Sequence, residues 1–158
     1  MREIKLTKGY YAKVDDDVYD YLMQWSWHVQ QSKKGIYYAS RTGSLAEGDL
    51  YKAQILMHRV IMKCPEGLVI DHINRDRLNN CTVNLRICTQ SQNQMNRGIQ
   101  SNNKSGYRGV SWNKGAWRAR IKVGGKEKGL GRFKTKEAAY EAYCRANIEL
   151  HGEYGCFE

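Results

Sequence analysis

The sequence has one proline, two phenylalanines and no apolar stretch close to the roughly 20 residues that a membrane-spanning helix needs. Its start also lacks the apolar core of a secretory signal, so neither membrane insertion nor secretion is expected. The five cysteines are odd in number and form no C-x-x-C pair. A disulfide framework and a zinc knuckle are therefore disfavoured, and free thiols in a reducing, cytoplasmic compartment are expected.

Acidic residues are nearly missing from one part of the chain. Segment 101–136 contains 11 Lys and Arg but a single acid, Glu127, whereas the remaining residues include 15 basic and 15 acidic ones. The whole formal net charge of +10 therefore lies within 36 residues. Scattered surface lysines do not concentrate in this way, so the charge indicates a polyanionic partner.

Hydrophobic patterning divides the chain into three parts. The expected elements before residue 61 are a strand with a turn over 6–14, an amphipathic helix over 15–25, and strands over 25–30, 35–41 and 52–61, with a turn-rich segment at 42–49. Next come a strand over 67–73, a long polar loop, a strand over 84–88 and a helix from residue 89. The last part contains strands over 106–113, 116–125 and 126–133 and a helix over 134–152. These patterns predict an α+β protein.

Segment 97–105 is polar, rich in turn-forming residues and almost free of hydrophobic side chains. It is typical of a linker between two domains. The predicted organisation is a first domain over 1–96, a linker over 97–105 and a second domain over 106–158.

The segment VIDHI, residues 69–73, ends an apolar strand with Asp71 and His72 side by side. Asn84 starts the next strand, and Asn93 lies on the helix that follows. A helix packed on a two-stranded hairpin brings Asn93 towards the strand end. Carboxylate and amide oxygens suit Mg²⁺ or Mn²⁺, and an unligated histidine near neutral pKa suits a general base. This combination is sufficient to hydrolyse a phosphodiester.

The same spacing closely resembles the HNH homing endonucleases of the phage and intron-encoded branch. The matching pieces are MHR at 57–59, VIDHI at 69–73, NN at 79–80, NLRICT at 84–89, and Asn93. The resemblance implies a ββα-metal finger with Asp71 and Asn93 as metal ligands and His72 as general base. It also implies that Asn84 holds the loop and orients the histidine. His58 matches the family's HR pair, with a structural or phosphate-facing role, and Asn96 is a possible competing ligand.

The basic segment resembles the Apetala-two/ethylene-response-factor DNA-binding domain over most of residues 103–152. The matching pieces are YRGV, WRARI, LGRF and EAAYEAY. Alternation along the WRARIKV strand places its basic side chains on one face of the sheet and its apolar side chains on the other. The alternation gives Arg118, Arg120 and Lys122 as the exposed basic positions. The resemblance implies DNA-facing positions at Arg108, Ser111, Asn113, Arg120, Lys122, Arg132 and Tyr143. Because Ser111 and Asn113 stand where the plant domains have arginines, the plant target sequence does not carry over.

The residue pattern and the resemblances together predict a metal-dependent, site-preferring DNA endonuclease of homing type that acts on double-stranded DNA, in the cytoplasm of a bacterial host if it is phage-encoded. No membrane contact or obligate protein partner is expected, and the protein is predicted to be a monomer or weak dimer. Each asparagine taken singly also suits a turn or a cap. The alternatives are a regulator that binds DNA without cutting it and a structural protein that grips phosphates.

Overall fold

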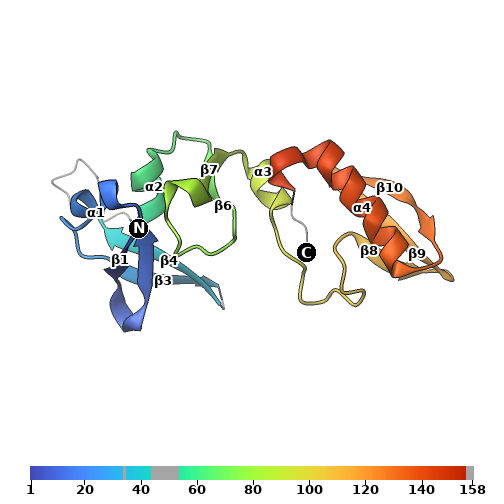
Figure 1. Ribbon diagram of the computed structural model, residues 1–158, viewed down its shortest axis with the longest axis horizontal. Helices are drawn as coiled ribbons and strands as arrows, with labels where there is room; N and C mark the ends of the chain where they lie inside the picture. The colour runs from blue at the N-terminus through green and yellow to red at the C-terminus, as the bar shows by residue number, and fades with distance from the viewer. Residues whose placement is uncertain (34, 44–53, 156–158) are drawn as a thin grey trace. The chain divides into compact units, whose positions relative to one another are not determined.

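The computed structural model describes residues 1–33, 35–43 and 54–155 (Figure 1), which fold as two compact units, Met1–Thr89 and Gln90–Glu158. Both units mix small antiparallel sheets with short helices, as the α+β prediction requires. Within the described residues, no helix is long and apolar enough to cross a membrane.

The first unit is built around a small apolar core. Strand β1 (Arg2–Lys5) and strand β2 (Tyr11–Val14) form a hairpin around the 3₁₀ turn η1 (Thr7–Gly9), and helix α1 (Asp16–Leu22) follows. A second antiparallel sheet has the order β3 (His28–Lys33), β4 (Ile36–Thr42) and β5 (Gln54–Leu56). The core contains Ile4, Leu6, Ala12, Val14, Leu22, Trp27, Ala39 and Met57.

Helix α2 (Met57–Met62) corrects the predicted strand over 52–61. Only Gln54–Leu56 is extended, and residues 52 and 53 lie outside the described part, as does most of the predicted turn at 42–49. Met57, Val60 and Ile61 all pack on the core, which is the i, i+3, i+4 spacing of a helix. The strand prediction was wrong at 57–61 because a short apolar run with β-branched residues fits either structure.

The hairpin of β6 (Val69–His72) and β7 (Leu85–Cys88) completes the first unit. The two strands are antiparallel, with Asp71 opposite Arg86 and His72 opposite Leu85. The loop between them ends in the 3₁₀ turn η3 (Thr82–Asn84). This arrangement confirms the predicted strand, long loop and strand.

The second unit begins with helix α3 (Gln90–Met95) and contains one antiparallel sheet of order β10–β9–β8. Its strands are β8 (Val110–Asn113), β9 (Ala116–Val123) and β10 (Lys126–Phe133). Helix α4 (Lys136–His151) lies along one face of this sheet and runs into the turn η4 (Gly152–Tyr154) (Figure 1). The predicted order of three strands and a helix is confirmed.

Two local features hold the second unit together. The Thr135 side chain caps α4 by accepting a hydrogen bond from the Ala138 amide at 3.2 Å, as its position before the helix predicts. The Tyr143 ring packs so closely on Gly109 that a Cβ there would overlap the ring, and Gly109 also has a φ of 70°. Glycine at this position therefore lets α4 approach the sheet.

The division into units falls between Thr89 and Gln90, which groups α3 with the second unit. The end of the predicted linker is also packed: Ser105 is buried, and its hydroxyl donates to the Val110 carbonyl at 2.8 Å. The side chain of Asn103 accepts hydrogen bonds from the Ser105 and Gly106 amides. Residues 103–105 thus form an ordered entry into the sheet.

Candidate functional site

Asp71 and His72 end strand β6 and have separate surroundings. Their side chains point to opposite sides of the hairpin because neighbouring residues on a strand alternate. Asp71 contacts Arg86 on β7, whereas His72 contacts the loop, helix α2 and strand β4. Both residues are buried, at 4% exposure each.

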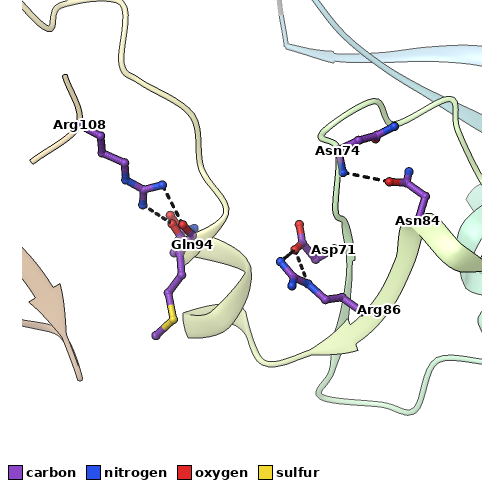
Figure 2. A network of polar contacts seen from close by, with 7 residues as sticks. Asp71, Asn74, Asn84, Arg86, Gln94 and Arg108 are labelled. Carbon is purple, nitrogen blue, oxygen red and sulfur yellow. Dashed lines mark hydrogen bonds and ion pairs between the residues drawn. The ribbon is translucent and has the colours of Figure 1, made fainter. Parts of the chain in front are cut away.

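Asn84 braces the loop between the two strands. Its Oδ1 accepts a hydrogen bond from the Asn74 amide at 2.9 Å (Figure 2), and its Nδ2 donates to the Asn79 carbonyl at 2.8 Å. Its backbone carbonyl accepts from the Ile73 amide at 2.8 Å. The Asn84 side chain therefore ties Asn74 and Asn79 of the loop to the residue before β7. The predicted role of Asn84 in orienting His72 stays a prediction.

The hydrogen-bond partner of His72 is Asn80, a residue that had no predicted role. The His72 Nε2 atom lies 3.3 Å from Asn80 Oδ1, and Asn80 is fully buried. Asn80 Nδ2 donates to the Leu78 carbonyl at 3.3 Å, and this carbonyl can only accept. The amide oxygen therefore faces His72, so Nε2 carries the ring proton and Nδ1 carries the lone pair. This is the tautomer of a base that acts through Nδ1.

Two aromatic rings lie close to the His72 ring. The His58 ring on α2 and the Tyr38 ring on β4 have centroids 5.0 Å and 6.3 Å from that of His72. Burial lowers the pKa of His72, partly opposed by its bond to Asn80. Burial also lowers the pKa of His58 to about 3, and the charge of His72 acts in the same direction. Both imidazoles are therefore neutral near pH 7, which is the form that accepts a proton.

His58 has a second unusual property. Its Nδ1 atom is buried and makes no hydrogen bond within the described part of the chain. A buried imidazole nitrogen without a partner strongly disfavours protonation, in agreement with the lowered pKa of this group.

Asp71 forms an ion pair with Arg86, on the facing strand (Figure 2). Arg86 Nη2 and Nε lie 2.6 Å and 2.9 Å from the same carboxylate oxygen, Oδ2. The side chains are 5% and 13% exposed, so this pair is far less screened by water than a surface pair. Like Asn80, Arg86 had no predicted role.

The donor types near β6 suit a hard divalent cation. Asp71 provides a carboxylate. Within the residues that the structure describes, no three His, Cys, Asp or Glu side chains form a cluster fit to hold a metal. One carboxylate with amide oxygens fits an ion that keeps several waters and takes further oxygens from a phosphate. Asn93 and Asn96 follow on and after α3, which belongs to the second unit, so the ligand role of Asn93 stays a prediction.

The basic side chains of β9 alternate with apolar ones as predicted. Ala119 and Ile121 are buried against α4, whereas Arg120 and Lys122 are exposed. Of the other predicted positions on this sheet, Ser111 is half-buried and Asn113 is exposed. Arg118 and Arg120 lie 3.8 Å and 3.1 Å from the Glu127 carboxylate. Arg132 donates hydrogen bonds to the carbonyls of Asn113 and Lys114.

Two predicted DNA-facing residues have structural partners instead. The Arg108 guanidinium donates to the carbonyls of Gln94, Met95 and Arg97 and thereby caps the end of α3. Figure 2 shows Arg108 beside Gln94. Tyr143 is 2% exposed and packs in the core of the second unit. A side chain as buried as Tyr143 does not reach DNA, and the Arg108 guanidinium makes three hydrogen bonds to backbone carbonyls. The DNA-facing roles of Arg108 and Tyr143 rest on the resemblance to the Apetala-two domain, and that resemblance does not predict their contacts with α3 and with the core.

Comparisons with known proteins place the hairpin and loop in a described family. Residues 56–95 match a family described as HNH endonuclease. Over 153 residues the chain is 31% identical to the uncharacterized HNH endonuclease L560 of Acanthamoeba polyphaga mimivirus, a match that covers 93% of this chain and 74% of that relative. It is also 34% identical over 95 residues to protein 3.8 of Escherichia phage T7, covering 59% of this chain and 78% of that protein. No solved structure matches.

The family match includes Asp71, His72, Asn84 and Asn93 and ends before the sheet of the second unit. The predicted resemblance of that unit to the Apetala-two family finds no support in this match.

Proposed function

This chain belongs to the HNH endonuclease family, and on that premise we propose that it is a metal-dependent enzyme that cuts double-stranded DNA, with His72 as general base. The observation that carries the proposal is the state of His72. Its Nε2 lies 3.3 Å from Asn80 Oδ1, and burial lowers its pKa, which together favour a neutral imidazole that presents Nδ1 as the acceptor. These are the properties required of a group that removes a proton from water.

In the proposed reaction, His72 Nδ1 takes a proton from a water molecule while the oxygen of that water bonds to the phosphorus. The bond from phosphorus to the leaving oxygen breaks at the same centre, and the DNA strand is cut. A divalent cation, which HNH nucleases generally use, would be held by Asp71 and would offset the charge on the phosphate and on the leaving oxygen. Asp71 is the proposed carboxylate ligand, and Asn84 and Asn80 hold the loop and the histidine in place.

Asn93 is the second proposed ligand. The family match continues to residue 95 and so includes Asn93. Since the proposed protein donors are carboxylate and amide oxygens, we propose Mg²⁺ or Mn²⁺ as the cation.

We assign DNA binding to the second unit. The excess positive charge of segment 101–136 and the exposed basic side chains of β9 support this assignment. We retain a mode like that of the Apetala-two domain, with the sheet in the major groove, as part of the proposal. The proposed contacts are Ser111, Asn113, Arg118, Arg120, Lys122 and Arg132. Arg108 and Tyr143 are left out because the one caps α3 and the other is buried in the core.

The homing type is proposed from the sequence resemblance. It predicts cleavage at a preferred site in DNA that flanks the gene, and mapping the cut ends on such DNA tests it. One finger serves one strand at a time, so a double-strand break requires a dimer or two successive cuts. With two successive cuts, a nicked intermediate precedes linear plasmid in a time course, whereas a dimer that cuts both strands together gives linear plasmid directly.

The main alternative is a regulator that binds DNA without cutting it. A supercoiled-plasmid assay with Mg²⁺ or Mn²⁺ separates the two functions. Wild type is expected to nick or linearise the plasmid. His72→Ala is expected to lose this activity while still binding the plasmid, and His28→Ala, on β3, serves as the control histidine. Equal cleavage by wild type and His72→Ala would remove the general-base assignment, and binding without cleavage by wild type would favour the regulator.

A further inference from the structure

The ion pair of Asp71 and Arg86 has consequences beyond stability. The two residues face each other in the register of the β6–β7 hairpin, so the backbone fixes their proximity. Two guanidinium nitrogens converge on a single oxygen of Asp71, at 2.6 Å and 2.9 Å. Because both side chains are largely buried, their charges act on each other and on any nearby ion with little screening.

This pair changes the charge that a cation meets at Asp71. The proposed metal site contains a single carboxylate, and the positive charge of Arg86 balances it. The pair is therefore neutral overall, whereas a typical magnesium site attracts its cation with net negative charge. A divalent ion that approaches Asp71 is also repelled by the guanidinium across a short, poorly screened distance.

We propose that Arg86 keeps the cation affinity of the DNA-free protein low and makes cation binding depend on DNA. The phosphates of bound DNA supply the negative charge that Arg86 removes from the site. Since coupling between two ligands is reciprocal, the cation strengthens DNA binding by the same factor. Arg86 thereby restricts the charged, metal-loaded state to the complex with DNA. This inference rests on the proposed function, because it takes Asp71 to be a metal ligand.

A different role for Arg86 predicts the opposite sign. Carboxylates that bind metals are often held in position by a second side chain, and removal of that side chain weakens metal binding. If Arg86 acted in this way, neutralising it would lower the cation affinity. The charge-balancing role predicts that neutralising Arg86 raises the affinity.

The test measures Mn²⁺ binding directly, from the electron paramagnetic resonance signal of free Mn²⁺, with full-length protein. All proteins carry His72→Ala, so that a short DNA duplex stays intact. In the absence of DNA, Arg86→Gln is expected to bind Mn²⁺ at least about tenfold more tightly than the protein with Arg86. Adding the duplex is expected to tighten Mn²⁺ binding strongly in the protein with Arg86 and much less in Arg86→Gln. Arg2→Gln removes the same charge from an arginine that pairs with Asp20 and is expected to change neither value.

Arg86→Lys provides a second variant for the case that Arg86→Gln does not fold. Lysine keeps the positive charge but loses the paired donors of the guanidinium. Under the charge-balancing role, its Mn²⁺ affinity stays close to that of the protein with Arg86. A clear loss of affinity in Arg86→Lys, or unchanged or weaker binding in Arg86→Gln, would overturn the inference.

Asp71→Asn separates this inference from the proposed function. If Asp71→Asn abolishes Mn²⁺ binding while Arg86→Gln fails to tighten it, the metal site stands and only the role of Arg86 falls. If Asp71→Asn leaves Mn²⁺ binding unchanged, Asp71 is not a ligand, and the proposed metal site falls together with the inference.

Discussion

His58 on helix α2 packs edge to face against His72 on strand β6, with 5.0 Å between the ring centroids and 83° between the ring planes. Both rings are buried. Protonating either imidazole places a poorly solvated charge beside the other, so the pair favours its doubly neutral form. A neutral His72 is what the proposed general base requires, and a neutral, buried His58 makes the fold sensitive to acid.

The first prediction concerns acid stability. The pKa of His58 is about 3 in the folded protein, compared with a usual value of 6.5. Between these values the unfolded chain binds a proton that the folded chain does not, so stability rises with pH and falls as pH is lowered through this range. The loss approaches about 1.4 kcal/mol per pH unit from this group. His58→Gln should make the free energy of unfolding depend less on pH. The smaller pH dependence that remains comes from His72.

Hydrogen exchange at amides of residues 1–89, followed from pH 7 to pH 4, provides the measurement. Val60→Ala is the matched control, because Val60 packs on the same core from the same helix but does not titrate. The control should lower stability by a similar amount at every pH. An acid sensitivity in His58→Gln equal to that of wild type would contradict the assignment of the effect to His58.

The second prediction concerns the pH dependence of cleavage. Burial lowers the pKa of His72, so its neutral, proton-accepting form persists below pH 6.5. The rate of cleavage should therefore stay level as pH falls through 6.5 and decline only at lower pH. Single-turnover cleavage of plasmid between pH 5 and pH 8, with saturating Mg²⁺, gives the profile. An acid limb centred at or above pH 6.5 would show that His72 is not the titrating base or is not buried during the reaction.

The third prediction concerns Asn80 as the residue that positions His72. In Asn80→Asp, a carboxylate receives the Nε2–H and stabilises the imidazolium, so the acid limb of the cleavage profile should move to higher pH. In Asn80→Ala the tautomer is no longer fixed, and the cleavage rate should fall by a factor of about 10²–10⁴, as on removal of general-base catalysis. Asn79→Ala is the control, since the Asn79 side chain accepts from the Cys81 amide.

The shift of the pH profile distinguishes positioning from a structural role. A merely structural Asn80 would lower the rate in both variants without moving the acid limb. Melting curves of each variant should accompany the rates, because Asn80 is fully buried and its loss also affects folding.

The secondary structure was largely predictable from local patterns, with two exceptions: β1, which was not predicted, and α2, which was predicted as a strand. Alternation along β9 identified the buried Ala119 and Ile121 correctly, since a half-buried strand leaves a clear period of two. The five residues from Met57 to Ile61 carry no such signal: they are apolar on one side at helical spacing, but too few for that period to stand out. Their helical state follows from packing on a core assembled from distant segments.

The sequence suggests candidate residues for the site but not their contacts. Asp71, His72 and Asn84 could be identified because their spacing matches a known motif. The bond from His72 to Asn80 depends on the path of a 12-residue loop, which no local rule determines. The pairing of Asp71 with Arg86 does have a sequence signal, an acid and a base at facing positions of two adjacent strands, but it requires the register of the hairpin to be known.

The fourth prediction tests the division of labour between the two units. If β9 contacts DNA phosphates, each lost contact should reduce the slope of log affinity against log salt by about one. Lys122→Gln removes an exposed charge of β9 and should lower this slope by about one. DNA binding at low salt should be weaker, and cleavage of saturating DNA should be unchanged. Arg120→Gln should have a smaller effect, because Arg120 is already paired with Glu127 at 3.1 Å.

Filter binding or fluorescence anisotropy between about 50 and 300 mM salt gives the slopes. Arg2→Gln in the first unit serves as the charge-matched control. If the slope falls equally in Arg2→Gln and in Lys122→Gln, the effect comes from net charge and not from contacts of β9 with DNA.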